Sequence, residues 1–259
     1  SACPGPPPPS SWGDIEGNEL CKIGRAQSPV AIDSSKAVGA VDMPPLAWLC
    51  GGKPCAGDGV AKYDADTPSK VREFYDGHFF TADSFAADGP PKITVDGTEY
   101  TLDELHFHTP SEHTIGGKYF DLEMQLVHST PEGRTLGVAV LMFTGDGSSG
   151  PGWVSELASV IAPCHLSPDS TACRLTAAPT LLASKFEFKQ VAISLAPLLK
   201  HYYRYTGSIT NPPCTEDVSW AVLRAPLEVS QDDWTAIAAL QGKNNRPLQP
   251  LNGRTITWV

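Results

Sequence analysis

Short apolar stretches separated by glycine, proline and polar turns recur along the chain, and few segments show the period of a long helix. The 259 residues include 23 glycines and 24 prolines, which favours strands and turns over helices. Alternation and apolar runs predict strands at residues 92–95, 98–102, 105–108, 120–128, 136–143 and 256–259. Helical periodicity predicts short helices at residues 153–161, 195–199 and 232–240. The pattern is typical of one domain dominated by a sheet.

The N-terminal residues break this pattern because they are rich in proline. Proline fixes φ and lacks a backbone N–H, so it is disfavoured inside helices and central strands. We therefore predict an extended arm over residues 1–11 and a single domain over residues 12–259.

The charge balance excludes several classes of partner. The chain carries 19 basic and 29 acidic side chains, a formal net charge of -10. This excess of acid argues against nucleic acid and against a polybasic membrane surface. No apolar run approaches the roughly 18 residues of a bilayer-spanning helix, so no membrane span is expected. The chain also begins without a charged-then-apolar leader, which indicates a mature or trimmed product.

Seven cysteines point to an oxidising compartment. Cys50 and Cys55 flank a tight turn, and Cys164 and Cys173 flank a short polar loop, so we expect two small disulfide loops. The compartment would be the extracellular space, a periplasm or an organelle lumen. The alternative is a set of unrelated buried thiols. Because the count is odd, one thiol stays unpaired, and Cys3 in the arm is available to link two chains into a dimer.

Two histidines one pleat apart form the first candidate site. Strand side chains alternate between faces, so His106 and His108 point the same way while Leu105 and Phe107 enter the opposite, apolar layer. Two imidazoles so placed can bind one metal ion if a neighbouring strand supplies a third ligand. The alternative is a pair of surface histidines on an edge strand.

The next predicted strand offers that third ligand. Glu123, Gln125 and Val127 share one face, and an antiparallel pairing can bring this face opposite His106 and His108. His128 is out of phase and is expected to be a hydrogen-bonded core histidine. The residue offered to the metal is therefore Gln125, whose amide oxygen is a weaker zinc ligand than imidazole.

Two other motifs compete for a functional interpretation. Residues 145–150 match GxGxxG, but no second strand of a βαβ unit follows, so a surface turn is expected instead of a dinucleotide site. The spacing of His106, His108 and Glu112 also matches the first cupin motif. That interpretation needs a later segment with a third histidine, and the sequence contains none.

Several ordered segments resemble the alpha-class carbonic anhydrases over nearly all of residues 12–259. The segments are Ser11-Trp12-Gly13, Gln27-Ser28-Pro29-Val30, Asp76-Gly77-His78, His106-Phe107-His108, Ser111-Glu112-His113-Thr114, residues 122–128, Tyr205-Thr206-Gly207, residues 208–214, Val218-Ser219-Trp220 and residues 245–250. The resemblance implies a mainly β (α+β) domain with a central, twisted, mostly antiparallel sheet of about ten strands. It also implies short peripheral helices, a conical cleft and a disulfide between Cys21 and Cys214.

The resemblance further implies the roles of individual residues. Zinc would bind at His106, His108 and the Gln125 position. Thr210 would accept a hydrogen bond from the zinc-bound hydroxide and donate to Glu112, and His78 would be the proton shuttle. The pocket for carbon dioxide would be formed by Val127, Val140, Ile209 and Trp220, with Asn211 at its polar edge. The groups that orient the zinc ligands would be Glu104, Glu123 and the backbone near Asn244.

Gln125 departs from the family pattern, which has histidine there. Its carbonyl oxygen can face a metal while its amide hydrogens donate to Glu123, the acceptor that would otherwise orient an imidazole. A related class of carbonic anhydrases uses two histidines and a glutamine, whereas non-catalytic relatives have usually lost a ligand histidine. The sequence therefore predicts reversible hydration of carbon dioxide to bicarbonate, slowed by the substitution. A binding or storage protein with a poor metal site is the alternative.

Overall fold

The computed structural model describes residues 8–40, 42–50, 53–54, 72–75, 80–83, 90–145, 150–166 and 188–259. Some predicted features lie outside these ranges, namely Cys3, Cys55, His78, Cys173 and residues 146–149 of the glycine-rich segment. The two local disulfides, the Cys3 link, the His78 shuttle and the surface turn therefore stay predictions.

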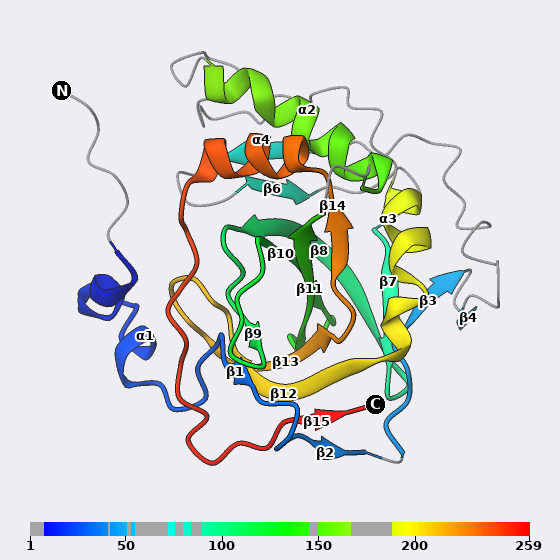
Figure 1. Ribbon diagram of the computed structural model, residues 1–259. Helices are drawn as coiled ribbons and strands as arrows, with labels where there is room; N and C mark the ends of the chain where they lie inside the picture. Colours follow the sequence, from blue (N-terminus) through cyan, green and yellow to red (C-terminus); the bar gives the residue numbers. More distant parts are fainter. Residues whose placement is uncertain are drawn as a thin grey trace.

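The described strands form one large twisted sheet and one small parallel pair (Figure 1). Their bounds are β1 (Ala31–Ile32), β2 (Val38–Gly39), β3 (Ala47–Cys50), β4 (Lys53–Pro54), β5 (Arg72–Tyr75), β6 (Phe80–Asp83), β7 (Lys92–Val95), β8 (Thr98–His108), β9 (Thr114–Ile115), β10 (Leu122–Ser129), β11 (Thr135–Thr144), β12 (Tyr202–Ser208), β13 (Glu216–Leu223), β14 (Leu227–Val229) and β15 (Thr257–Trp258). The main path of the sheet runs β2-β15-β12-β13-β11-β10-β8-β7-β3-β4, with β14, β5 and β6 joined at its sides. Most neighbours are antiparallel, while β11 is parallel to β13 and β14. This architecture confirms the predicted fold class.

Helices are short and lie around the sheet. Their bounds are η1 (Pro9–Asp14), α1 (Leu20–Ile23), α2 (Gly152–Leu166), α3 (Phe188–Leu195), η3 (Leu198–Lys200) and α4 (Gln231–Gln241). Helices α2 and α4 lie side by side along one end of the sheet (Figure 1), where Ser155 Oγ donates to Asp233 Oδ2 at 2.8 Å. Helix α4 begins at a serine cap, since the Ser230 side chain accepts a hydrogen bond from the Asp233 backbone N–H.

Three predicted elements differ from the structure. The helix expected at residues 195–199 is wrong: α3 ends at Leu195 and η3 begins at Leu198, because Pro197 disfavours helix at the residue before it. Two predicted strands, 98–102 and 105–108, are one strand, β8, which runs through two acidic residues with exposed or half-buried side chains. Residues 9–11 of the predicted arm belong to η1, where proline is tolerated in the first turn.

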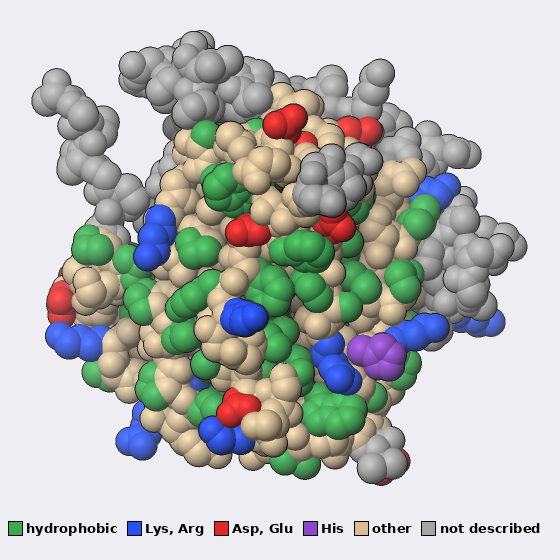
Figure 2. All heavy atoms as spheres, in the orientation of Figure 1, with side chains coloured by type: hydrophobic (Ala, Val, Ile, Leu, Met, Phe, Trp, Pro, Cys, Tyr) green, Lys and Arg blue, Asp and Glu red, His purple; other side chains and the backbone are tan. Residues whose placement is uncertain are grey.

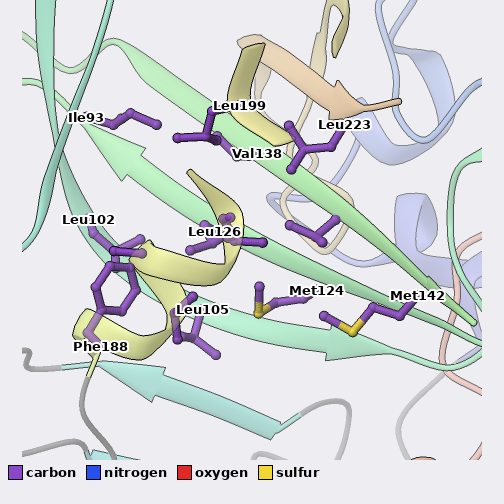
Figure 3. Packing of buried hydrophobic residues seen from close by; sticks show 14 of the residues in the cluster. Ile93, Leu102, Leu105, Met124, Leu126, Val138, Met142, Phe188, Leu199 and Leu223 are labelled. Carbon is purple, nitrogen blue, oxygen red and sulfur yellow. The ribbon is translucent and has the colours of Figure 1, made fainter. Parts of the chain in front are cut away.

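Strand alternation divides the apolar side chains between two cores. The larger core lies on the face of β8, β10 and β11 that α2, α3 and α4 cover, and Figure 3 shows α3 carrying Phe188 toward this cluster. Its strand members include Leu105, Phe107, Met124, Leu126, Val138 and Val140. The smaller core lies on the other face and includes Ala139, Leu141, Tyr205, Val218, Trp220 and Val222. The candidate site shares this second face.

A disulfide joins the N-terminal segment to the turn between β12 and β13. Cys21 and Cys214 are 193 residues apart and have their Cα atoms 5.0 Å from each other. This confirms the pairing that the family resemblance implied. Because disulfides persist in oxidising surroundings, the bond indicates an oxidising compartment.

The surface shows no concentrated positive charge on the face drawn in Figure 2, where lysine and arginine side chains lie at separate positions among neutral ones. In the described ranges, no helix is long and apolar enough to cross a membrane.

Candidate metal centre

The register between β8 and β10 brings the predicted ligands together. Gln125 lies directly opposite His106, and Glu123 lies opposite His108. Because directly opposed residues of an antiparallel pair share a face, these four side chains project to the same side of the sheet. All four are buried. The prediction that antiparallel pairing would align the two strand faces is confirmed.

The Gln125 carboxamide has a defined orientation. Its nitrogen donates to Glu112 Oε2 and to Glu123 Oε1, each at 2.8 Å. Its oxygen lies 3.2 Å from His106 Nε2. The predicted donation to Glu123 is therefore present, and it is accompanied by a second donation, to Glu112.

The distance between two of the predicted donor atoms is compatible with a zinc ion. Tetrahedral zinc with bonds of about 2.0–2.1 Å places neighbouring ligand atoms about 3.3 Å apart, and the 3.2 Å between His106 Nε2 and Gln125 Oε1 is close to this edge. His106 Nδ1 lies 3.2 Å from Glu104 Oε1, so Nε2 faces the site. No described cluster of three His, Cys, Asp or Glu side chains is arranged to hold a metal, so a metal ion at this position would need the amide oxygen of Gln125 as a ligand.

The two histidines differ in their electrostatic surroundings. Burial and, to a smaller extent, the nearby His106 lower the pKa of His108 to about 3, while a hydrogen bond with the Asn244 backbone opposes the shift. A neutral imidazole is the form that binds a metal. Burial also disfavours the charged form of His106, but the Glu104 carboxylate overcomes this effect and raises the pKa of His106 above its usual value. The expected contacts to Glu104 and to the backbone at Asn244 are therefore present.

Glu123 is the most heavily hydrogen-bonded carboxylate of the site. Its Oε2 accepts from the backbone N–H groups of Glu112 and His113 at 2.9 and 2.7 Å. Its Oε1 lies 2.8 Å from His113 Nδ1 and also accepts from Gln125. Burial alone would raise the pKa of Glu123, but its contacts with His113 hold that pKa below the usual range. Glu123 is therefore a negatively charged carboxylate held in place next to Gln125.

Behind Glu123, a buried chain of polar groups continues into the smaller core. His113 Nε2 lies 2.6 Å from the Tyr205 hydroxyl, which lies 2.8 Å from Ser28 Oγ. Every one of these side chains is buried. His113 stood in a recognised sequence segment, but its link to Tyr205 could not be found from the sequence because the two residues are 92 positions apart.

Glu112 connects the site to the C-terminal segment. The backbone N–H of Arg246 donates to Glu112 Oε1 at 2.7 Å, and the Thr210 hydroxyl also hydrogen-bonds to Glu112. Burial and the neighbouring Glu123 charge raise the pKa of Glu112. Thr210 Oγ1 additionally lies 3.4 Å from Gln125 Oε1. The Thr210 to Glu112 contact expected from the family resemblance is therefore present.

Arg246 is itself a buried cation, and no sequence pattern singled out its side chain. The guanidinium donates to Ser28 O at 2.7 Å, to Gln27 Oε1 at 2.9 Å and to Cys21 O at 3.1 Å. Residue 246 thus bridges the N-terminal segment and the carboxylate of Glu112.

The structure corrects one residue of the predicted apolar pocket. Val140 pairs with Met124 and belongs to the larger core on the opposite face of the sheet. The residue opposite Gln125 on β11 is Ala139. Alternation within β11 shows which of its residues share a face, but not which of the two faces carries the site. That choice depends on the register between β11 and β10.

Three other predicted pocket residues, Val127, Trp220 and Ile209, lie on the site's side of the sheet. Val127 is half-buried and lies opposite Gly137, which in turn lies beside Trp220 on β13. Trp220 is buried, and its Nε1 donates to Ser208 O at 2.9 Å. Ile209 packs against the smaller core, and Asn211 is half-buried.

His128 has the structural role that its strand phase predicted. It is buried on the far side of the sheet, its Nδ1 lies 3.1 Å from Leu126 O, and its ring lies beside Trp48. Burial lowers its pKa to about 4, so it is a neutral core histidine.

Fold and site together define a mainly β domain with a histidine and carboxamide site in its sheet, and comparison with known proteins gives the family. The family model for eukaryotic-type carbonic anhydrases matches residues 7–259. A carbonic anhydrase from Klebsiella pneumoniae is 32% identical over 250 residues, covering 96% of this chain and 86% of that protein. An alpha-carbonic anhydrase structure from Thermovibrio ammonificans has a TM-score of 0.73 and 29% identity, covering 96% of this chain and 94% of that one. The chain belongs to the eukaryotic-type carbonic anhydrase family of enzymes, which generally depend on zinc.

Another relative has a different name. Dioscorin DB3L from Dioscorea polystachya is 29% identical over 253 residues, covering 96% of this chain and 81% of that protein. Proteins named carbonic anhydrase and proteins named dioscorin are therefore both similar to this chain over almost its full length.

Proposed function

We propose that this protein catalyses the reversible hydration of carbon dioxide to bicarbonate and a proton, with zinc held by His106, His108 and Gln125. The observation that carries the proposal is the orientation of Gln125, whose oxygen faces His106 Nε2 at 3.2 Å while its nitrogen is turned to two carboxylates. Zinc bound there would lower the pKa of a water molecule from 15.7 to about 7 and so supply a nucleophile at neutral pH.

Thr210 and Glu112 would orient the attacking oxygen. If the Thr210 hydroxyl donates its proton to Glu112, its lone pairs remain to accept a hydrogen from the nucleophile. Arg246 N–H donates to Glu112 Oε1, which restrains the carboxylate to which Thr210 would donate. Such a fixed dipole costs no reorganisation during the reaction.

Apolar side chains would receive the substrate. Val127, Ile209 and Trp220 provide aliphatic and aromatic surface suited to a small uncharged molecule, and Asn211 adds a polar edge. Proton export needs a group that titrates near neutrality, and histidine is the side chain that does so unperturbed. The family resemblance assigns this role to His78.

The oxidising compartment that the disulfide indicates is, in this proposal, the extracellular space, a periplasm or an organelle lumen. The proposed substrate is a small molecule, and no nucleic acid or membrane partner is proposed. A disulfide between the Cys3 residues of two chains is the proposed way in which a dimer would form.

The alternative function is a binding or storage protein with little or no catalysis. The observation in its favour is Gln125 itself, because loss of the orienting contacts of a metal ligand alone typically weakens metal binding about 10–100-fold. Retention of the Thr210, Glu112 and Glu123 contacts favours the enzyme, since a purely structural cavity needs none of them.

Gln125→His tests the proposal directly. We expect the wild type to bind one zinc and to hydrate carbon dioxide above the buffer rate, and Gln125→His to bind zinc about 10–100-fold more tightly and to react faster. Gln125→Leu, which removes the oxygen donor, is the matched control and should lose both properties. Zinc content and stopped-flow hydration give the two measurements. Absence of hydration even in Gln125→His would favour the binding protein.

A further inference from the structure

One carboxamide in this site is shared between two buried carboxylates. Gln125 Nε2 donates one hydrogen to Glu112 Oε2 and the other to Glu123 Oε1, at 2.8 Å each. Gln125, Glu112 and Glu123 are all buried. A primary amide has two N–H groups and can satisfy both carboxylates, whereas an imidazole bound to a metal through one nitrogen has a single N–H left.

From this geometry we infer that Glu112 is a positioning residue for the ligand oxygen of Gln125, so that zinc affinity in this chain depends on Glu112 as well as on Glu123. The inference rests on the proposed function, because it concerns the same zinc site. It goes beyond the proposed role of Glu112 as the partner of Thr210.

The energetic reason is the cost of turning the amide over. A rotated carboxamide would place its oxygen against two carboxylate oxygens and its NH₂ group toward His106. Each buried carboxylate would then lose a charge-assisted donor, and hydrogen bonds of this kind are roughly twice as strong as neutral ones. Two acceptors therefore fix the orientation more firmly than Glu123 could alone, and a firmly held ligand atom needs less reordering when the metal binds.

Glu112 does this by accepting hydrogen bonds at both of its side-chain oxygens. Its Oε1 accepts from Arg246 N–H at 2.7 Å while its Oε2 accepts from Gln125. In Glu112→Gln, one of the two terminal atoms becomes an NH₂ group, which would face either the Arg246 N–H or the Gln125 amide, donor against donor. The variant thus keeps the size of the side chain and removes one acceptor.

A double-mutant cycle measures the coupling. Zinc affinity is determined by competition with a chelator for the wild type, Glu112→Gln, Gln125→His and the double variant. We expect Glu112→Gln to weaken zinc binding about 10–100-fold in the wild-type background. In the Gln125→His background the same change should alter affinity by no more than about twofold, because an imidazole does not use Glu112 as a second acceptor, and this non-additivity is the coupling that the cycle measures. If Glu112 has only a structural role, Glu112→Gln should weaken zinc binding by the same factor in both backgrounds.

The outcomes separate this inference from the proposed function. Zinc binding by the wild type that Glu112→Gln leaves unchanged, or weakens equally in both backgrounds, overturns the inference and leaves the zinc enzyme standing. A wild type that binds no zinc overturns both. If Glu112→Gln does not fold, Glu112→Asp replaces it, because its shorter side chain cannot reach both Arg246 and Gln125.

A measurement on the unaltered protein completes the test. The side-chain amide signals of Gln125 are identified in a ¹⁵N spectrum by their loss in Gln125→His. Two donations to carboxylates should shift both amide protons downfield and slow their exchange with solvent. An amide with only one shifted proton, or with two freely exchanging protons, would contradict the role of Glu112 whatever the variants do.

Discussion

At the scale of single residues, the site is supported by polar side chains that do not themselves face the predicted metal. Tyr205 links Ser28 to His113, and His113 links Tyr205 to Glu123. Each group is buried, so a lost partner is not replaced by water without cost. The orientation of the ligands is therefore tied to hydrogen bonds formed deep in the smaller core.

Tyr205→Phe tests this support. Removing the hydroxyl leaves His113 Nε2 and Ser28 Oγ without their contact, so we expect the free energy of unfolding to fall by about 1–3 kcal/mol. Tyr203→Phe is the matched control, because the Tyr203 hydroxyl donates to Ser34 Oγ nearer the surface, and a smaller loss is expected there. Urea unfolding of both variants measures the two losses of unfolding free energy. Equal losses would show that the buried hydrogen bonds of Tyr205 stabilise the protein no more than the Tyr203 hydrogen bond does.

At the scale of elements, β11 and β13 meet through a residue without a side chain. Gly137 lies beside Trp220 in the parallel pair, and a Cβ at position 137 would lie only 2.7 Å from Trp220 Cζ3. The indole therefore occupies the space that another residue at 137 would need. This lets Trp220 lie next to the strand face that carries Val127 and Gln125.

Gly137→Ala should disturb this contact. Overpacking of a filled core typically costs about 1–3 kcal/mol, and the displaced indole should change the near-ultraviolet circular dichroism. Gly152→Ala is the control, because a Cβ there meets nothing within 4 Å, and its effect should be small or stabilising. A Gly137→Ala variant as stable as Gly152→Ala, with an unaltered spectrum, would mean that Trp220 can move aside freely.

At the scale of the whole molecule, one covalent bond and one buried cation join the N-terminal segment to the rest. The Cys21–Cys214 disulfide closes a loop between positions that are 193 residues apart. Cys214 O also accepts from Gln27 Nε2 at 3.0 Å. The N-terminal segment is thus anchored beside the residues that follow Thr210.

Removal of this disulfide should destabilise the protein strongly. For a loop of 193 residues, chain entropy gives a loss of about 5 kcal/mol. The Cys21→Ser/Cys214→Ser variant should therefore unfold at lower urea concentration than the oxidised wild type. Peptide mapping without reduction should find the Cys21–Cys214 link together with the predicted Cys50–Cys55 and Cys164–Cys173 links, and free thiols at these local pairs would contradict the two loops.

Strand alternation is a local property, so the sequence predicted β7, β8, β10, β11 and β15, the shared face of His106, His108 and Gln125, and the core position of His128. It failed where register or distant packing decides. Val140 was assigned to the wrong face because nothing in β11 alone fixes its pairing with β10. The second hydrogen bond of Gln125, to Glu112, depends on the path of residues 109–121 between β8 and β10. No pattern of residues in the sequence predicts that path.

The buried guanidinium of Arg246 has a consequence for where this domain can begin. All three of its side-chain acceptors come from residues 21–28, and a buried charge stripped of its partners is strongly destabilising. A chain shortened to start beyond Ser28 would leave the Arg246 guanidinium without these acceptors. The backbone N–H of the same residue donates to Glu112, so the position of Glu112 would be disturbed as well. The minimal unit able to assemble the site therefore reaches back at least to Cys21, well before the first strand of the sheet.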